Sequence, residues 1–254
     1  MTFFEDGLLR ISPRCSLNDP FELLPAKPNF QEWMIFMNQC KDFHLSKLVS
    51  SQADLKTLKK EELYWEKYIK AELDYFGDKK AKTFYNHSWT ESMRKIDEIG
   101  GVISLSSRWD SSLMWAHYSN SHNGFCIGFN IDKIRENIGG IFEVLYSDSR
   151  YKIRLGETSE VNFNVFYTKS KDWSYEQEYR VIKLFSEADQ VLKFDSDTIY
   201  LTVFVPDLIS EIIIGSRASL DIINTIQQFC DKHSIQLFRA IEADYTFNMD
   251  RLKV

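Results

Sequence analysis

The stretch KSKDWSYEQEYRVIKL, residues 169–184, combines acidic, basic and aromatic side chains that could act on a polar substrate. Glu176 and Glu178 lie two positions apart where a β-forming segment begins. Alternate residues of a strand share a face, so we expect both glutamates to point the same way as Arg180. One interpretation is a solvated edge strand whose glutamate–arginine ion pair contributes little to stability. A second interpretation is an aromatic-lined site that carries carboxylates, and Trp173 and the apolar residues that follow favour it.

The segment LNDPFE, residues 17–22, has the pattern of a helix start. Asp19 would cap free N–H groups, and a proline suits the first helical position. This structural interpretation and a functional one both stand, because a cap does not explain why Asn18 precedes it or why Phe21 and Glu22 follow.

A third polar segment, SSLMWAHYSNSHNGFCIGFN, covers residues 111–130. Trp115 and Tyr118 are at helical spacing, which is typical of core packing. His117 and His122 are five apart, which is not the i, i+4 pair that a helix offers a metal ion. We therefore expect no metal site, and His122 is expected in a turn before a strand.

The composition of the 254 residues indicates a folded globular chain. Its net charge of −6 argues mildly against a protein that coats DNA through a basic surface. The four cysteines match no zinc or disulfide spacing. The first residues carry no basic stretch followed by an apolar one, and no apolar run is long enough to span a membrane. We expect a soluble, cytoplasmic protein with reduced thiols.

The pattern along the chain predicts the α+β class, with a mainly antiparallel and strongly bent sheet in a single domain over residues 1–254. A charged block almost free of Gly and Pro, residues 29–99, predicts a helical insertion of three helices with breaks near Ser50 and Gly77. Strands are expected at the segments GLLRIS, VISLSS, GFCIGFNI, IFEVLY, VNFNVFY, EYRVIKLF, TIYLTVFV, EIIIG and IQLFRAIEA. Further helices are expected at 112–119, 132–137 and 218–233.

Taken together, the chain resembles a bacterial family catalogued only as a domain of unknown function. The motifs that carry the resemblance are LRISPRCSLNDPFE, ISLSS, LMWAHY, HNGFCIGF, LY and KSKDWSYEQEYR, in this order along most of the chain outside the helical block. Many relatives have a further tyrosine- and base-rich strand ahead of the first motif. The family resemblance implies no reaction.

More distantly, the order of motifs is similar to that of ADP-ribosyltransferases of the bacterial-toxin type, which carry an arginine, a Ser-x-Ser strand and a Glu-x-Glu pair. The resemblance implies an ADP-ribosyltransferase-like fold with NAD as substrate. Glu178 would stabilise the positive charge that builds on the ribose as the nicotinamide bond breaks. Glu176 would orient or deprotonate the acceptor, and Ser104 would position Glu178.

The same resemblance implies a cofactor site in which an arginine binds the pyrophosphate and an aromatic ring stacks on the nicotinamide. The residues expected to form it are Arg10, Arg14, Asn18, Trp115, Tyr118, His122, Trp173 and Arg180. The protein would be an NAD-consuming transferase or glycohydrolase, acting as a toxin or a phage-defence effector on a protein or nucleic-acid acceptor.

Two alternatives come from other classes. The first is a binding module whose motifs are structural and whose helices between residues 53 and 98 offer a surface to a protein partner. The second is a hydrolase or nuclease without a bound metal, which would use Glu178 together with His117 and His122.

Overall fold

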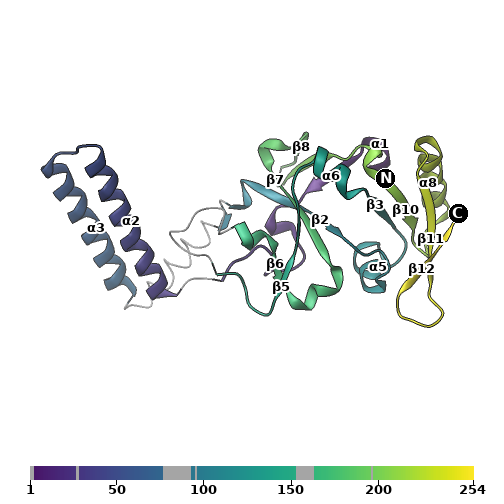
Figure 1. The fold of residues 1–254 in the computed structure, drawn as a ribbon, viewed down its shortest axis with the longest axis horizontal. Coiled ribbons are helices and arrows are strands. Elements are labelled where there is room, and N and C mark those ends of the chain that lie inside the picture. Colours follow the sequence, from purple (N-terminus) through teal and green to yellow (C-terminus); the bar gives the residue numbers. More distant parts are fainter. Residues whose placement is uncertain (1–2, 27–28, 77–92, 95, 153–162, 196) are drawn as a thin grey trace.

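The computed structural model describes residues 3–26, 29–76, 93–94, 96–152, 163–195 and 197–254, and the fold is α+β (Figure 1). The α-helices are α1 (Phe3–Asp6), α2 (Phe30–Ser50), α3 (Leu55–Phe76), α5 (Ser112–Tyr118), α6 (Ile131–Asn137) and α8 (Leu220–His233). The 3-10 helices are η1 (Arg14–Ser16), η2 (Phe163–Tyr167), η3 (Lys171–Glu176), η4 (Phe185–Glu187) and η5 (Pro206–Leu208).

The strands form several short, mostly antiparallel sheets, where we expected one bent sheet. The orders are β1-β9-β8, β12-β11-β10-β3, β2-β7-β4 and β5-β6. Their bounds are β1 (Leu8–Ile11), β2 (Gly100–Ser106), β3 (Phe125–Phe129), β4 (Ile141–Glu143), β5 (Leu145–Ser147), β6 (Thr168–Ser170), β7 (Glu178–Leu184), β8 (Gln190–Lys193), β9 (Thr198–Val203), β10 (Ile209–Ile214), β11 (Gln236–Glu242) and β12 (Met249–Lys253).

The β2-β7-β4 sheet carries the motifs of interest. β7 is central and pairs antiparallel with both neighbours, so its backbone groups are satisfied on each side. One face of β2 and β7 supplies Ile103 and Val181 to the main hydrophobic core. β1 is joined to this sheet by a bridge between Ser12 and Val102, where a side chain on Gly101 would collide with the Ser12 carbonyl. Glycine is therefore required at the junction.

A second region is built on β10 and β11, which run parallel with α8 between them in the chain. A parallel pair needs such a crossover connection. α8 is capped by Ser219, whose side chain accepts the N–H of Ile222, and it buries Ile226 and Cys230 against the strands. Apolar burial of this kind holds the sheet and helix together.

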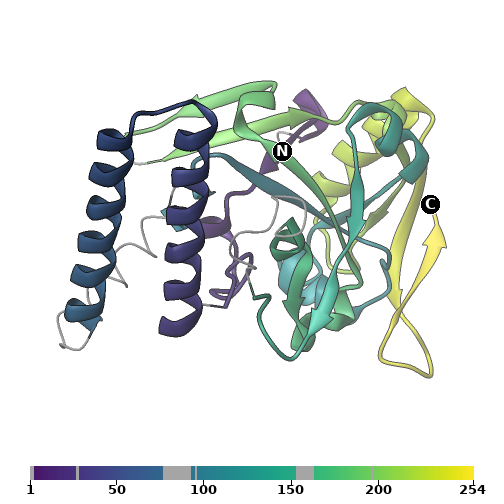
Figure 2. The ribbon, with the colours of Figure 1, turned by 60° about the vertical axis from the view of Figure 1, so that its left-hand side comes forward.

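α2 and α3 form an antiparallel pair that extends away from the sheets (Figures 1 and 2). α2 starts with a capping box, in which the Asn29 side chain accepts from the Glu32 N–H and Glu32 accepts from the Asn29 N–H. The rings of His44 and Trp65 lie 6.1 Å apart between the two helices. No helix among the described residues is long and apolar enough to cross a membrane.

Most expected elements are present, with the break after Ser50 confirmed. The third helix of the block falls largely on residues 77–92, outside the described part, and the division into one domain with an insertion stays a prediction. The strand expected at VNFNVFY is wrong, because 163–167 is the 3-10 helix η2. The helix start expected in LNDPFE is also wrong: Asp19 accepts the Phe21 N–H, but only a turn follows.

Candidate functional site

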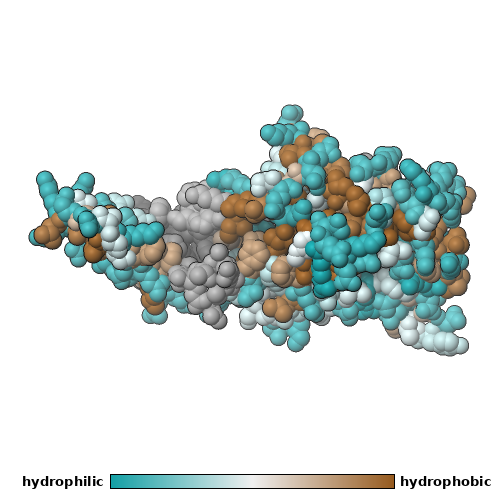
Figure 3. Space-filling model, turned by 45° about the horizontal axis from the view of Figure 1, so that its top comes forward, coloured by the Kyte–Doolittle hydropathy of each residue, from teal (hydrophilic) through white to brown (hydrophobic). Residues whose placement is uncertain are grey.

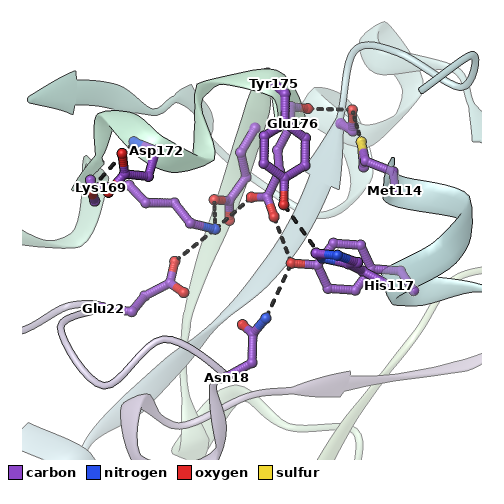
Figure 4. Close-up of polar contacts among 12 residues, drawn as sticks. Asn18, Glu22, Met114, His117, Lys169, Asp172, Tyr175 and Glu176 are labelled. Carbon is purple, nitrogen blue, oxygen red and sulfur yellow. Dashed lines mark hydrogen bonds and ion pairs between the residues drawn. The ribbon is translucent and has the colours of Figure 1, made fainter. Parts of the chain in front are cut away.

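Five charged side chains meet in the interior beside β7, and Figure 4 labels three of them, Glu22, Lys169 and Glu176. We call Glu22, Lys169, Glu176, Glu178 and Arg180 the charge cluster; each is at most 6% exposed. Burying charges is costly unless they are paired and hydrogen-bonded, so their partners decide what this group can do.

Arg180 forms the inner half of the charge cluster. Its Nε and one terminal nitrogen lie 2.7 and 2.9 Å from the two carboxylate oxygens of Glu178, a bidentate pair. The same terminal nitrogen also donates to Glu22, and the other donates to the Phe166 carbonyl at 2.7 Å. The guanidinium is fully buried, so it is not available to a ligand, and the expectation that Arg180 binds a cofactor is corrected.

Lys169 forms the outer half. Its ammonium lies 2.5 Å from Oε2 of Glu176, 2.9 Å from Oε2 of Glu178 and 3.2 Å from Oε1 of Glu22. One cation thus joins three carboxylates that come from a turn, a 3-10 helix and a strand. Glu178 therefore has both oxygens occupied by cations, and it is 3% exposed. The expected direct role of Glu178 at a ribose does not fit this arrangement.

A left-handed residue brings the two glutamates together. Gln177 has φ 44° and ψ 55° and connects the end of η3 to the start of β7. Such a conformation is unfavourable for a residue with a side chain, at a cost on the order of 1 kcal/mol. Alternation predicts Glu176 on the same strand face as Glu178, but Glu176 lies at the end of η3 and not in a strand. The turn at Gln177 allows both carboxylates to reach Lys169.

The cluster contains three acids and two bases. Burial and the charges of these neighbours together shift the pKa values of its carboxyl groups. Burial raises the pKa of Glu22 above its usual range despite the nearby Arg180 and Lys169. Burial also opposes ionisation of Glu178, but its bonds to Arg180 and the charge of Lys169 hold its pKa below the usual range. Glu22 is thus the carboxyl whose pKa is shifted towards the protonated form.

Tyr118 connects the charge cluster to the surface. Its hydroxyl donates to Oε1 of Glu176 at 2.5 Å, accepts from the Asn18 amide at 3.4 Å, and belongs to a side chain that is 53% exposed. Burial and the hydrogen bond to Glu176 raise the pKa of Tyr118, so the phenol stays protonated. The structure therefore brings Asn18, Tyr118 and Glu176 together, and their roles at a ligand stay a prediction.

The expected Ser-x-Ser strand does lie against the acidic strand. In the β2–β7 register Ser106 is opposite Glu178, and Ser104 is opposite Arg180. The Ser106 hydroxyl donates to the Glu176 carbonyl at 2.6 Å. Ser106, rather than Ser104, is the residue that fixes the acidic turn.

Next to the cluster, an open pocket of about 350 Å³ carries aromatic and acidic groups. It is lined by Asp19, Pro20, Phe21, Ser170, Asp172, Trp173 and Tyr175. Trp173 also covers the ammonium of Lys169, at 5.2 Å from the ring centre. We call this the aromatic pocket.

A second pocket of about 270 Å³ shares Phe21 and Ser170 with the aromatic pocket. Its lining is rich in hydroxyl groups, from Ser147, Ser149, Tyr151 and Thr168, and includes the exposed Arg150. The carboxylate of Asp148 also lines it and lies 3.7 Å from the ammonium of Lys171. The Arg150 guanidinium lies 5.7 Å from the centre of the Phe21 ring, so one aromatic side chain separates the two spaces. We call this the hydroxyl pocket.

Several expected cofactor residues lie elsewhere. Arg14 is paired with Asp97 at 2.6 Å, and Arg10 lies 3.8 Å from Asp197; neither contacts Glu178 in the described part of the chain. Trp115 is 3% exposed in the core, where its Nε1 donates to a backbone carbonyl, so it cannot stack on a ligand.

The two histidines face different surroundings. His117 is exposed, and its Nδ1 is 3.4 Å from the Tyr175 hydroxyl, beside the aromatic pocket. His122 lies in the expected turn and stacks on Trp115. The described residues contain no group of three His, Cys, Asp or Glu arranged to hold a metal ion.

Sequence reasoning missed Glu22, Lys169, Phe21 and Arg150 as site residues. For Glu22 and Phe21 a signal existed, because a helix cap left both unexplained in LNDPFE. For Lys169 the signal was its place in the acidic and aromatic segment. Arg150 stands in a polar loop without a recognisable pattern.

Comparison with known families gives one match. No curated protein and no solved structure matches the chain. The resemblance to ADP-ribosyltransferases is thus without support from a known relative, and it stays a prediction. Residues 114–181, from α5 to the middle of β7, match the family model described as protein of unknown function (DUF2971). Over that range, which includes Tyr118, Lys169, Glu176 and Glu178, this chain is similar to a family whose function is unassigned.

Proposed function

We propose that the chain binds a dinucleotide of the NAD class, in its oxidised form, across the aromatic and hydroxyl pockets. The observation that carries the proposal is that two pockets of different chemistry share Phe21 and Ser170. An oxidised pyridine dinucleotide has matching halves, since its pyridinium ring is a flat cation and its pyrophosphate is an anion.

The aromatic pocket suits the pyridinium ring. Trp173 and Tyr175 offer ring faces, with their centroids 6.1 Å apart, and Phe21 is 59% exposed on the other side. Cations are attracted to such faces, and the carboxylates of Asp19 and Asp172 add to the attraction. The same charges would disfavour a phosphate group here.

The hydroxyl pocket suits the phosphates. Arg150 supplies a planar guanidinium that can hold phosphate oxygens in pairs, and Ser147, Ser149 and Thr168 add hydroxyl donors. The one carboxylate in this lining, Asp148, is paired with Lys171, which offsets its charge. Lys169 also lines this pocket. Its ammonium is already held by the three glutamates, so it is not proposed as a phosphate ligand.

The charge cluster serves this site as a support. Lys169 holds the carboxylate at the end of η3, and η3 carries both Trp173 and Tyr175. Ring positions that are fixed before a ligand arrives lower the entropy cost of binding. The motif is therefore proposed to order the pocket, with Glu178 and Arg180 as its structural base.

A reaction on the bound dinucleotide is the finer proposal. The bond from nicotinamide to ribose would break, with its electron pair leaving on neutral nicotinamide, while water or an acceptor forms the new bond to the ribose carbon and gives its proton to the assisting carboxylate. Both glutamates are 3% exposed and neither lines either of these pockets, but Glu176 is favoured over Glu178 as the assisting carboxylate, because one of its oxygens is bound by the hydroxyl of the partly exposed Tyr118 instead of by a cation. A transferase or glycohydrolase, used as a toxin or defence effector, would act in this way.

The test compares ligands by calorimetric titration and follows nicotinamide release in the same samples. Oxidised NAD should bind more tightly than its reduced form or ADP-ribose, which lack the positive ring. Binding without nicotinamide release would support a binding module and reject the reaction. Equal or stronger binding of ADP-ribose would reject the pyridinium site. For the nuclease alternative, no observation favours joint action of His117 and His122.

A further inference from the structure

The projecting pair α2–α3 carries seven lysines and seven acids, so its total charge is balanced, but the lysines of α3 gather on one side of the helix. Its position away from the sheets leaves the outer side of α3 open (Figures 1 and 2), and its surface mixes hydrophilic and hydrophobic residues (Figure 3). This surface is separate from the two pockets, and the inference does not rest on the proposed function.

Five lysines of α3 share one side of the helix. At about 100° per residue they fall within an arc of about 100°, and from the first to the last they span about 21 Å. They are Lys56, Lys59, Lys60, Lys67 and Lys70, and all five are exposed. We call them the lysine face.

Among the residues that the structure describes, no carboxylate pairs with the lysine face. Glu61, an acid of α3, points to α2 instead, where its carboxylate lies 3.4 Å from His44. Of the exposed acids of α3, Asp74 falls within the arc, one turn beyond the last lysine, and Glu66 lies about 20° outside its edge, whereas Glu62 lies farther round on another side. A face that is merely solvated more commonly mixes both signs.

We propose that the lysine face binds the phosphate backbone of a nucleic acid. A row of ammonium groups over about 21 Å matches a polymer with regularly spaced negative charges, and release of its counterions drives binding. The ring of Tyr64, 59% exposed and stacked on Tyr68 at 6.3 Å, borders the row and offers a surface for a base. An acidic protein and an anionic membrane are the competing partners.

The test uses fluorescence anisotropy of the full chain with labelled RNA and DNA of about 20 nucleotides, over a range of salt concentrations. The variant Lys59→Gln/Lys60→Gln/Lys67→Gln keeps good helix formers, so α3 should remain folded. Its control, Lys193→Gln/Lys232→Gln/Lys253→Gln, removes three exposed lysines from other elements and gives the same net charge.

We expect wild type and control to bind with similar affinity, and the α3 variant to bind at least about tenfold more weakly with a salt slope lower by about 2. Equal loss in the control would show that only net charge matters, which contradicts the proposal. Tighter binding to polyglutamate or to anionic vesicles than to both nucleic acids would also overturn it. No binding of RNA or DNA at low salt would do the same.

Discussion

The ammonium of Lys169 lies under the ring of Trp173, 5.2 Å from its centre, while it joins the carboxylates of Glu22, Glu176 and Glu178. One side chain therefore links the buried charge cluster to the aromatic pocket. A change to Lys169 should affect both the stability of the fold and the order of the pocket, and these two effects can be measured apart.

Replacing Lys169 by methionine should lower the free energy of unfolding by about 3–5 kcal/mol, because three buried carboxylates would be left with Arg180 alone. Urea denaturation of wild type and variant measures this difference. Lys171→Met is the matched control, since that lysine is two positions away and 67% exposed. It should change stability by less than about 0.5 kcal/mol. Similar effects of both substitutions would mean that the cluster is not a structural base.

Tyr118 should make the fold sensitive to alkaline pH. Its pKa is raised above that of the unfolded chain, so its contribution to stability is complete below about pH 10 and is lost as pH rises further. In Tyr118→Phe the loss of stability between about pH 9 and pH 11 should be shallower than in wild type. Lys169, whose pKa is also raised, contributes equally to both proteins.

The control for this pH series is Tyr245→Phe, because Tyr245 is 97% exposed. Its profile should follow that of wild type. If Tyr118→Phe shows the wild-type profile as well, the pKa of Tyr118 is the same in the folded and unfolded chain, and the hydrogen bond to Glu176 does not shift it.

The sequence predicts the strands that position the site better than the site itself. VISLSS and EYRVIKLF alternate in a way that indicates strands, and they form β2 and β7 side by side. Glu176 was expected on the same strand face as Glu178, but the left-handed turn at Gln177 has no glycine to signal it. Local patterns report on alternation, and a turn held by tertiary contacts leaves no such pattern.

Long-range pairing was the part that no local pattern could supply. Glu22 reaches Arg180 across most of the chain, and Arg14, expected at a pyrophosphate, is instead bound by Asp97. The four-residue strand β8 and the terminal β12 were missed, since each is short and largely exposed and therefore lacks a clear alternation. The acids and bases of these pairs can be seen in the sequence, but the sequence does not show which acid forms an ion pair with which base.

If the bound dinucleotide is cleaved, Glu176→Gln should reduce nicotinamide release by about 10²-fold or more, as expected for loss of a carboxylate that assists a proton or charge transfer. The amide has the same size but cannot carry the charge. Glu143→Gln, an exposed substitution on β4, is the control and should keep the wild-type rate. Release that survives in Glu176→Gln would remove Glu176 from the reaction or indicate a contaminating enzyme.

The Trp173 ring should contribute to affinity as a stacking surface. Trp173→Leu keeps an apolar cover over Lys169 but removes the large aromatic face, and we expect binding of oxidised NAD to weaken by about tenfold. Calorimetric titration gives the affinity, and a melting curve shows whether the fold is retained. An unchanged affinity would contradict a pyridinium site beside Trp173.

The most direct test of the account is calorimetric titration of oxidised NAD into wild type, Phe21→Ala and Phe247→Ala. Phe21 lines both pockets and is 59% exposed, so its loss should disturb binding more than folding; Phe247 is 96% exposed and lines neither pocket. We predict that wild type and Phe247→Ala bind with one affinity and that Phe21→Ala binds at least about tenfold more weakly. If wild type does not bind NAD, or if Phe21→Ala binds as tightly as wild type, the proposed dinucleotide site is wrong.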